Sequence, residues 1–185
     1  GQKGGNIIVK YVNQSGKELK TEMLKGNVGN ATSINPPTTG IFSNYNLVPN
    51  QNLVATFSPE EQVITSNYDG KPAKPLTVKH FGTDGHVFSS EVIANKKYGD
   101  NYQFERGEQD GYSFDRVVGN KVGTYTNENQ QVTFYYKKIP VKKITITGNY
   151  LDESTGNELA PSIRLSWVVG ADYPTTVKPI KGYNT

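Results

Sequence analysis

The side chains best suited to chemistry in this 185-residue chain are aromatic: it has 12 tyrosines, 7 phenylalanines and 1 tryptophan. A tyrosine ring offers a flat apolar face and a hydroxyl group, so an exposed tyrosine can stack on a sugar ring and form hydrogen bonds with it. The alternation in Val132–Tyr136 places Phe134 and Tyr136 on one face of a strand and Tyr135 on the other. Tyr135 is therefore the candidate ligand-binding residue. The aromatic residues expected in the core are Tyr11, Tyr102, Tyr112, Phe134, Tyr136 and Trp167.

Catalytic side chains in a working arrangement are not found. The two histidines, His80 and His86, flank an Asp84-Gly85 turn, and two imidazoles alone make a poor metal site. We expect a structural or surface role for both. No serine lies in a Gly-x-Ser-x-Gly elbow, and the paired carboxylates at 60–61 and 152–153 lie in turns rather than across a cleft. We predict a protein that is not an enzyme, with no catalytic, cofactor-binding or metal-binding residue.

One acidic cluster leaves an alternative open. Four acidic residues surround the Gly111-Tyr112 pair, namely Glu105, Glu108, Asp110 and Asp115. Calcium takes several oxygen ligands from loops of this kind, but the spacing of an EF-hand is absent. Incidental surface charge is the favoured interpretation, and a Ca²⁺ site is the alternative.

The composition excludes several other classes of protein. There is no cysteine, so disulfides and thiolate metal sites are absent. An isopeptide crosslink between a buried lysine and an Asn or Asp side chain is a hypothesis for how small modules would be stabilised instead. The net charge of +3 is small and the Lys and Arg residues are spread along the chain, which argues against nucleic-acid binding. No apolar run of 18 residues occurs, so membrane insertion is not expected.

Three similar segments must position these side chains. Each has an alternating run, a turn centred on glycine and a second extended run, and the central glycines are Gly16, Gly85 and Gly156. Repeats at such a period indicate tandem modules. The resulting division is a linker or tag remnant at 1–5, modules at 6–68, 76–138 and 144–185, and linkers at 69–75 and 139–143.

The modules are predicted to be mostly β, because Val, Ile, Thr, Tyr and Asn are common and Leu is scarce. In the first module we expect a strand at 7–12, a returning strand at 17–24, and strands at 45–48, 53–57 and 61–68. The polar stretch 26–40 contains Pro36 and Pro37 and is expected to be a loop, or at most a short helical turn. The third module lacks closing strands, so it is either truncated or completed from outside, and we expect it to be the least ordered or to pair with a neighbour.

The repeats resemble the MucBP (mucin-binding protein) domain of Gram-positive surface proteins. The second module carries all four motifs of that resemblance in order, at Val78–Gly85, Gly99–Tyr102, Gly111-Tyr112 and Gly123–Tyr136. The third carries the first three, at Gly148-Asn149-Tyr150, Gly170–Tyr173 and Gly182-Tyr183, and the first of these departs from the opening motif. The first departs most, with Thr32 at the central tyrosine, Ile41 after Gly40, and Ala55–Ser58 in place of the Gly-Thr run.

The resemblance implies small modules of the β-grasp or ubiquitin-like α+β kind, arranged as an elongated tandem array. It implies an extracellular, cell-wall-anchored protein whose anchor lies outside this segment. The implied partners are mucin or other host glycoproteins, bound by weak multivalent contacts, and neighbouring repeats of the same protein. A structural stalk that projects a separate binding domain from the cell wall is the alternative function.

Overall fold

The computed structural model describes the backbone of residues 1–151 and 158–170 and the side chains of residues 1–141. Several predictions for the third module lie outside the described part: the burial of the Trp167 side chain, and the segments that contain Tyr173 and Gly182-Tyr183. The expectation that the third module is the least ordered, or pairs with a neighbour, also lies mostly outside the described residues.

The first module is a mixed four-stranded sheet with a small two-stranded sheet beside it. Its strands are β1 (Ile7–Val12), β2 (Glu18–Leu24), β3 (Ala31–Ser33), β4 (Tyr45–Leu47), β5 (Val54–Thr56) and β6 (Gln62–Gly70), and a 3₁₀ turn η1 (Gly40–Asn44) precedes β4. The strand order is β2-β1-β6-β4, and β3 pairs with β5. The predicted strands are present, whereas the prediction of a strand-free 26–40 segment is wrong because β3 lies within it.

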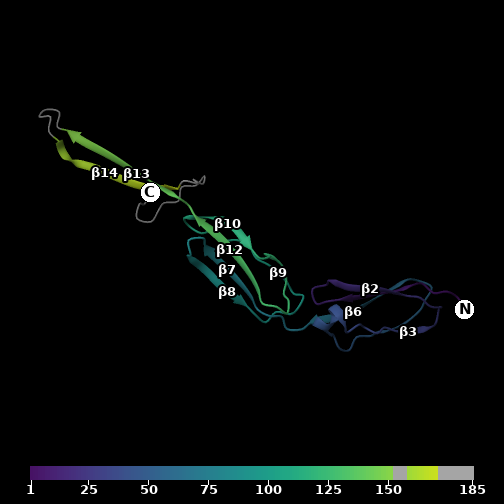
Figure 1. Cartoon of the computed structure of the whole chain (residues 1–185). Helices are drawn as coiled ribbons and strands as arrows, with labels where there is room; N and C mark the ends of the chain where they lie inside the picture. Colours follow the sequence, from purple (N-terminus) through teal and green to yellow (C-terminus); the bar gives the residue numbers. More distant parts are fainter. Residues whose placement is uncertain (152–157, 171–185) are drawn as a thin grey trace.

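The second module repeats this plan with six further strands. They are β7 (Leu76–Gly82), β8 (Val87–Ile93), β9 (Asn101–Gln103), β10 (Tyr112–Val118), β11 (Val122–Thr124) and β12 (Gln130–Lys138). The order β10-β12-β7-β8 and the separate β9/β11 pair mirror the first module. Figure 1 shows the first two modules end to end, with the N-terminus at the far end of the first.

The two central strands of each sheet run parallel. β1 pairs with β6 in register Ile7↔Gln62, and β7 pairs with β12 in register Leu76↔Gln130. The two glutamines make equivalent hydrogen bonds in the two modules. Gln62 Nε2 donates to the Thr56 carbonyl (2.9 Å), and Gln130 Nε2 donates to the Thr124 carbonyl (3.0 Å). These matched bonds tie the small sheet to the large sheet in each module.

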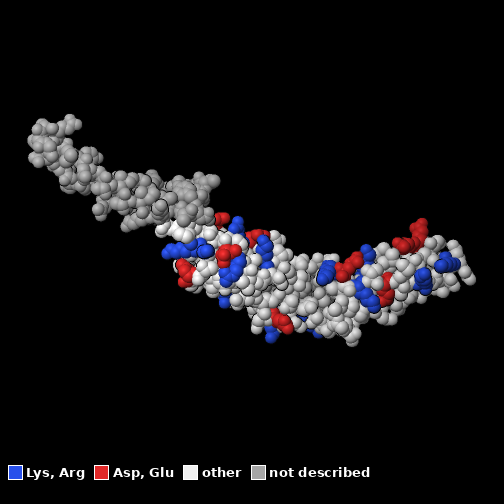
Figure 2. Space-filling view, turned by 45° about the horizontal axis from the view of Figure 1, so that its top comes forward, with Lys and Arg blue, Asp and Glu red and all other residues white. Residues whose placement is uncertain are grey.

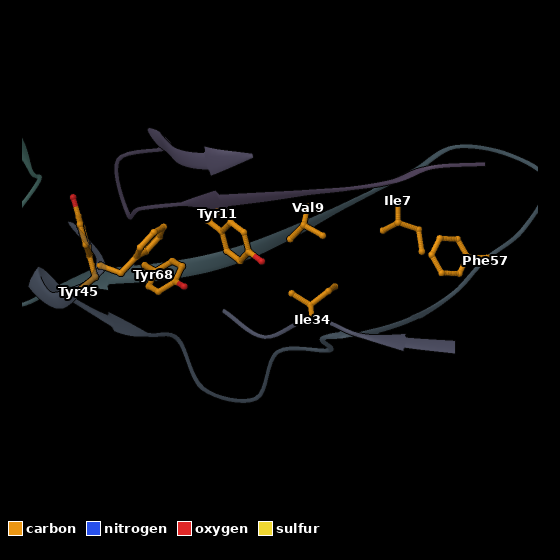
Figure 3. Packing of buried hydrophobic residues seen from close by; sticks show 8 residues of the cluster. Ile7, Val9, Tyr11, Ile34, Tyr45, Phe57 and Tyr68 are labelled. Atoms are coloured by element: carbon orange, nitrogen blue, oxygen red, sulfur yellow. The ribbon is translucent and has the colours of Figure 1, made fainter. Parts of the chain in front are cut away.

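The cores follow from alternation along the central strands. In the first module Ile7, Val9 and Tyr11 point inward from β1 and are fully buried. Side chains from other elements complete this core, and Figure 3 shows Ile34 facing the β1 side chains from a separate segment. The buried core members beyond β1 are Ile34, Phe42, Tyr45, Phe57 and Tyr68. Burial of apolar surface of this kind is the main stabilising term for so small a module.

The matched register corrects one detail of the sequence comparison. Tyr45 begins β4 and pairs with Gly70 at the end of β6, just as Tyr112 begins β10 and pairs with Lys138 at the end of β12. The first module therefore has a counterpart of Tyr112, and it is Tyr45. Reading Ile41 at this position was wrong, because η1 inserts a turn between Gly40 and the strand.

The third module contributes a long hairpin to the described chain. β13 (Val141–Leu151) pairs antiparallel with β14 (Glu158–Gly170), with register shifts near Tyr150. The predicted opening hairpin of this module is therefore confirmed.

The terminal and connecting segments are hydrogen bonded to the modules. The amide groups of Gly4 and Gly5 donate to the carbonyls of Gly26 and Ser58 (2.9 and 2.8 Å). In the second module Ala73 makes the matching bond, donating to the Lys96 carbonyl at 2.8 Å.

Candidate ligand-binding face

Tyr135 lies on the outer face of the second sheet, opposite the core. Its neighbours across the ladder are Arg116 on β10 and Phe81 on β7, and Phe81 pairs in turn with Val87 on β8. Residues that pair directly on neighbouring strands project to the same face. We call this cross-strand set Arg116, Tyr135, Phe81 and Val87 the aromatic row.

Cationic side chains flank the aromatic row. The Arg116 guanidinium carbon lies 4.3 Å from the Tyr135 ring centroid, and Lys79 Nζ lies 5.4 Å from the Phe81 centroid. Such contacts stabilise a cation over the negative face of a ring. Asp115 pairs with Arg116, so the guanidinium is held beside the ring with some of its donors engaged. The row thus combines half-buried rings with hydrogen-bond donors, a combination suited to polyhydroxylated ligands.

Charge elsewhere on the surface is mixed in sign. Figure 2 shows Lys and Arg interspersed with Asp and Glu along the first two modules, without a continuous cationic stripe on the face in view. This face therefore offers no extended cationic surface.

The predicted core aromatics are mostly buried. Tyr11, Tyr102, Phe134 and Tyr136 are at most 8% exposed, so their assignment to the core is confirmed. Burial raises the pKa of Tyr11 to about 12, with the nearby Glu22 carboxylate as a second cause. The Tyr11 hydroxyl therefore stays neutral at physiological pH, and all four rings serve packing.

Tyr112 is only half-buried, and its hydroxyl forms a hydrogen bond with the turn that contains Asp84. Its hydroxyl donates to Asp84 Oδ2 (2.7 Å), while the His86 amide donates to Asp84 Oδ1 (3.1 Å). These two bonds, with that from Tyr112 the larger cause, lower the pKa of the Asp84 carboxyl. In the first module Asn13 replaces this carboxylate, accepting from the amides of its own turn and donating to the Tyr45 hydroxyl at 3.2 Å.

The two histidines have separate aromatic partners. His80 stacks on Phe134 with a centroid distance of 4.9 Å, and its Nδ1 lies 2.7 Å from the Tyr136 hydroxyl oxygen. The Gly107 amide also donates to that oxygen (2.8 Å). Burial lowers the pKa of His80. His86 packs on Phe88 with a centroid distance of 4.6 Å, so each imidazole has a packing role.

The acidic residues around Gly111-Tyr112 are dispersed in their contacts. Glu105 accepts a hydrogen bond from Gln103 (2.9 Å), and Asp115 pairs with Arg116. Within the described residues no three acidic or histidine side chains form a group that could hold a metal ion, so the calcium alternative has no defined geometry there.

The isopeptide hypothesis requires a buried lysine. Among the side chains that the structure describes, the buried polar ones are Asn13, Ser66 and Thr133. No lysine of residues 1–141 is therefore placed for that reaction. In the same part of the chain, no helix has the length and apolar character needed to cross a membrane.

Comparison with known proteins gives similarity over nearly the whole chain. The family model for the MucBP domain matches residues 6–69, 75–137 and 145–185. Internalin J of Listeria monocytogenes serotype 4b (strain F2365) is 32% identical over 98% of this chain, which covers 20% of that protein. Internalin I of L. monocytogenes serovar 1/2a (strain EGD-e) is 30% identical over 96% of this chain, which covers 10% of that protein. The chain thus spans a fifth or less of these relatives.

Two solved structures also align with the chain. Mub-RV aligns over 74% of this chain and 100% of its own, with 14% identity and a TM-score of 0.30. Streptococcal High Identity Repeats in Tandem (SHIRT) domains 3–4 align over 74% and 99%, with 10% identity and a TM-score of 0.27. These scores are too low to carry a structural argument, whereas the family match covers most of the residues. The chain belongs to the MucBP domain family and contains three repeats of that domain.

Proposed function

We propose that this chain is a non-enzymatic adhesion segment of a Gram-positive surface protein and binds mucin or other host glycoproteins. The observation that carries the proposal is the aromatic row on the outer face of the second sheet, with Arg116 stacked over Tyr135. Family membership supports the class of ligand. The proposed protein is extracellular and attached to the cell wall by an anchor outside this segment, and it needs no cofactor.

We further propose that each module is of the β-grasp kind. The mixed sheet with a parallel central pair supports this assignment, since that pair is β1/β6 in the first module and β7/β12 in the second. In the first module the one turn of 3₁₀ helix, η1, would occupy the place of the β-grasp helix.

The test is binding of the purified chain to immobilised mucin, before and after enzymatic removal of glycans. Tyr135→Ala should weaken glycan-dependent binding by at least about fivefold, the effect of losing roughly 1 kcal/mol at an interface anchor. The matched control is Asn67→Ala, because Asn67 pairs with Val12 as Tyr135 pairs with Phe81. Equal binding by Tyr135→Ala and the unmodified chain would exclude the aromatic row as the ligand contact.

A stalk is the second candidate function, and a different observation favours it. The first and second modules are joined through side-chain contacts, including a Lys97–Asp69 ion pair of 2.7 Å and a Tyr45–Tyr98 ring contact with a centroid distance of 5.4 Å. A spacer requires such a joint, whereas an adhesion segment does not. A chain that unfolds cooperatively but does not bind mucin or its glycans would favour the stalk.

A further inference from the structure

The strongest unassigned feature of the molecule is the surface at which the first two modules meet. On the first module it consists of the β1–β2 turn (Asn13–Ser15), Tyr45 and the end of β6. On the second module it consists of the loop Lys97–Asp100 that leads into β9. We refer to the turn Asn13–Ser15 as the pin and to the loop Lys97–Asp100 as the socket.

Gln14 connects three parts of this surface. Its Nε2 donates to the Tyr98 carbonyl (2.8 Å) and to Asp100 Oδ1 (3.0 Å). Its Oε1 accepts from the Gly70 amide (2.9 Å). One side chain therefore binds the socket and, at the same time, the last residue of β6. Both the nitrogen and the oxygen of the side-chain amide are used, which fixes its orientation.

Close backbone packing accompanies these bonds. Ser15 Oγ donates to the Gly99 carbonyl (2.9 Å). A Cβ atom at Gly99 would lie 2.7 Å from the Tyr45 hydroxyl and 2.9 Å from Asn13 Nδ2. A Cβ atom at Gly70 would collide with the Tyr98 carbonyl oxygen. The two modules therefore approach each other at glycines, where any side chain would separate them.

The chain between the modules has little freedom of its own. The Lys71 amide donates to the Asn44 carbonyl of the first module (2.9 Å), and the Lys71 carbonyl accepts from the Tyr98 amide of the second (2.7 Å). Pro72 bridges to Lys97, and its ring fixes φ. The Lys74 amide donates to the Thr126 carbonyl (2.9 Å). Hinge motion would require breaking several of these bonds together.

The first module has a loop that matches the socket in backbone geometry, although no pin lies against it. In the first module the matching loop is Asn27–Asn30, at the N-terminal end of the molecule (Figure 1). Gly29 has φ +89° and Gly99 has φ +88°. The Gly29 amide donates to the Phe57 carbonyl (2.9 Å), as the Gly99 amide donates to the Tyr125 carbonyl (3.0 Å). The socket is therefore formed by the module itself, and docking requires little reordering.

We propose that pin and socket form a specific docking surface between consecutive modules, which holds the first and second modules as one rigid body in solution. This goes beyond ligand binding and does not depend on the identity of any ligand. Separate domains joined by a small contact normally reorient. Here the tied connecting chain, the Gln14 bonds and the Tyr45–Tyr98 contact together prevent it.

The test measures the distance between spin labels on the two modules of the full chain. The chain has no cysteine, so Lys25→Cys and Lys121→Cys provide unique labelling sites on exposed residues of the first and second modules. The unmodified joint should give one narrow distance distribution. Gln14→Ala should broaden it, and Gln14→Ala combined with Tyr98→Ala should broaden it further.

The matched control is Gln51→Ala. Gln51 also makes three hydrogen bonds, to the Val48 carbonyl, the Asn67 carbonyl and the Asn67 amide, but all lie within the first module. This variant should keep the narrow distribution even if it lowers stability. The proposal is overturned if the unmodified chain gives a broad distribution. It is also overturned if the double variant stays as narrow as Gln51→Ala while the circular dichroism spectra of all variants show folded modules.

Discussion

Ser66 offers a prediction whose sign and size follow from the repeat. Its side chain is fully buried on β6, beside Tyr11 on β1. The Ser66 hydroxyl is the one buried side-chain group without a hydrogen-bond partner in the described part of the chain. At the matching position of the second module Phe134 lies beside His80. The two modules therefore fill the same core space in different ways. In the first module the large side chain is Tyr11 on the first strand and the small one is Ser66 on the last strand. In the second module the smaller side chain is His80 on the first strand and the large one is Phe134 on the last strand.

A buried hydroxyl without a partner costs about 1–3 kcal/mol relative to water. Ser66→Ala removes that oxygen and leaves only a small void, so we expect the free energy of unfolding to rise by about 1 kcal/mol. For a unit of this size the melting temperature would rise by roughly 4–8 °C. Chemical and thermal denaturation followed by circular dichroism measure both quantities. Ser90→Ala, an exposed position on β8, is the control and should change stability by no more than about 0.5 kcal/mol.

The opposite change tests the size pairing itself. Ser66→Phe should destabilise the first module by about 1–3 kcal/mol, since a second large ring overfills the space beside Tyr11. Adding Tyr11→His should restore part of that loss, with a coupling energy of about 0.5–3 kcal/mol. A destabilising Ser66→Ala would refute the argument, because it would show that the hydroxyl has a partner such as a buried water. Additive effects of Ser66→Phe and Tyr11→His would refute the size pairing.

Two more predictions concern the second module and the joint. Burial lowers the pKa of His80 from 6.5, so the unfolded chain binds a proton at His80 more readily than the folded chain. The free energy of unfolding should therefore be highest above about pH 6.5 and fall as the pH drops through the folded-state pKa of His80. Denaturation midpoints between pH 7.5 and 5.5 measure this slope, and a His80→Gln variant that keeps the full slope would contradict it. Gly99→Ala should cost more than Gly29→Ala, since both glycines have φ near +90° but only a Cβ atom at Gly99 meets the other module. Left-handed strain alone costs about 1–2 kcal/mol, so equal losses in paired denaturation curves would show that the joint contact is not stabilising.

Sequence alternation was sufficient to predict the main sheets. Val132, Phe134 and Tyr136 are buried as their period indicates, and Tyr135 lies on the opposite face of the strand. The three-residue strands β3 and β9 escaped prediction because so short a strand in a polar stretch has no detectable period. The match between Tyr45 and Tyr112 was also missed, because it depends on pairing with the end of the last strand and not on the preceding glycine.

The side-chain contacts between the first and second modules could not be predicted from the sequence. Gln14 reaches residues 84 and 86 positions away, and one of its partners there is a backbone carbonyl, which every residue type possesses. A single exposed glutamine in a turn carries no signal of such a role. The requirement for Gly99 was partly visible, since a glycine at that position indicates positive φ. The second reason for that glycine, contact with Tyr45 across the joint, appears only in the structure.

The aromatic row and the joint differ in how they repeat, and this difference bears on the mode of adhesion. At the positions of Tyr135 and Phe81 the first module has Asn67 and Val12, so the row occurs once in the two described modules. Linked modules gain avidity only when each carries a binding surface. Of these two modules, only the second would thus make contact through the row, with the first docked rigidly beside it. Tyr135→Ala should then weaken glycan-dependent binding by at least about fivefold, whereas two equivalent binding modules would leave about half of the sites intact. A residual signal of that size in the mucin assay would show that the chain also binds through a surface other than the aromatic row.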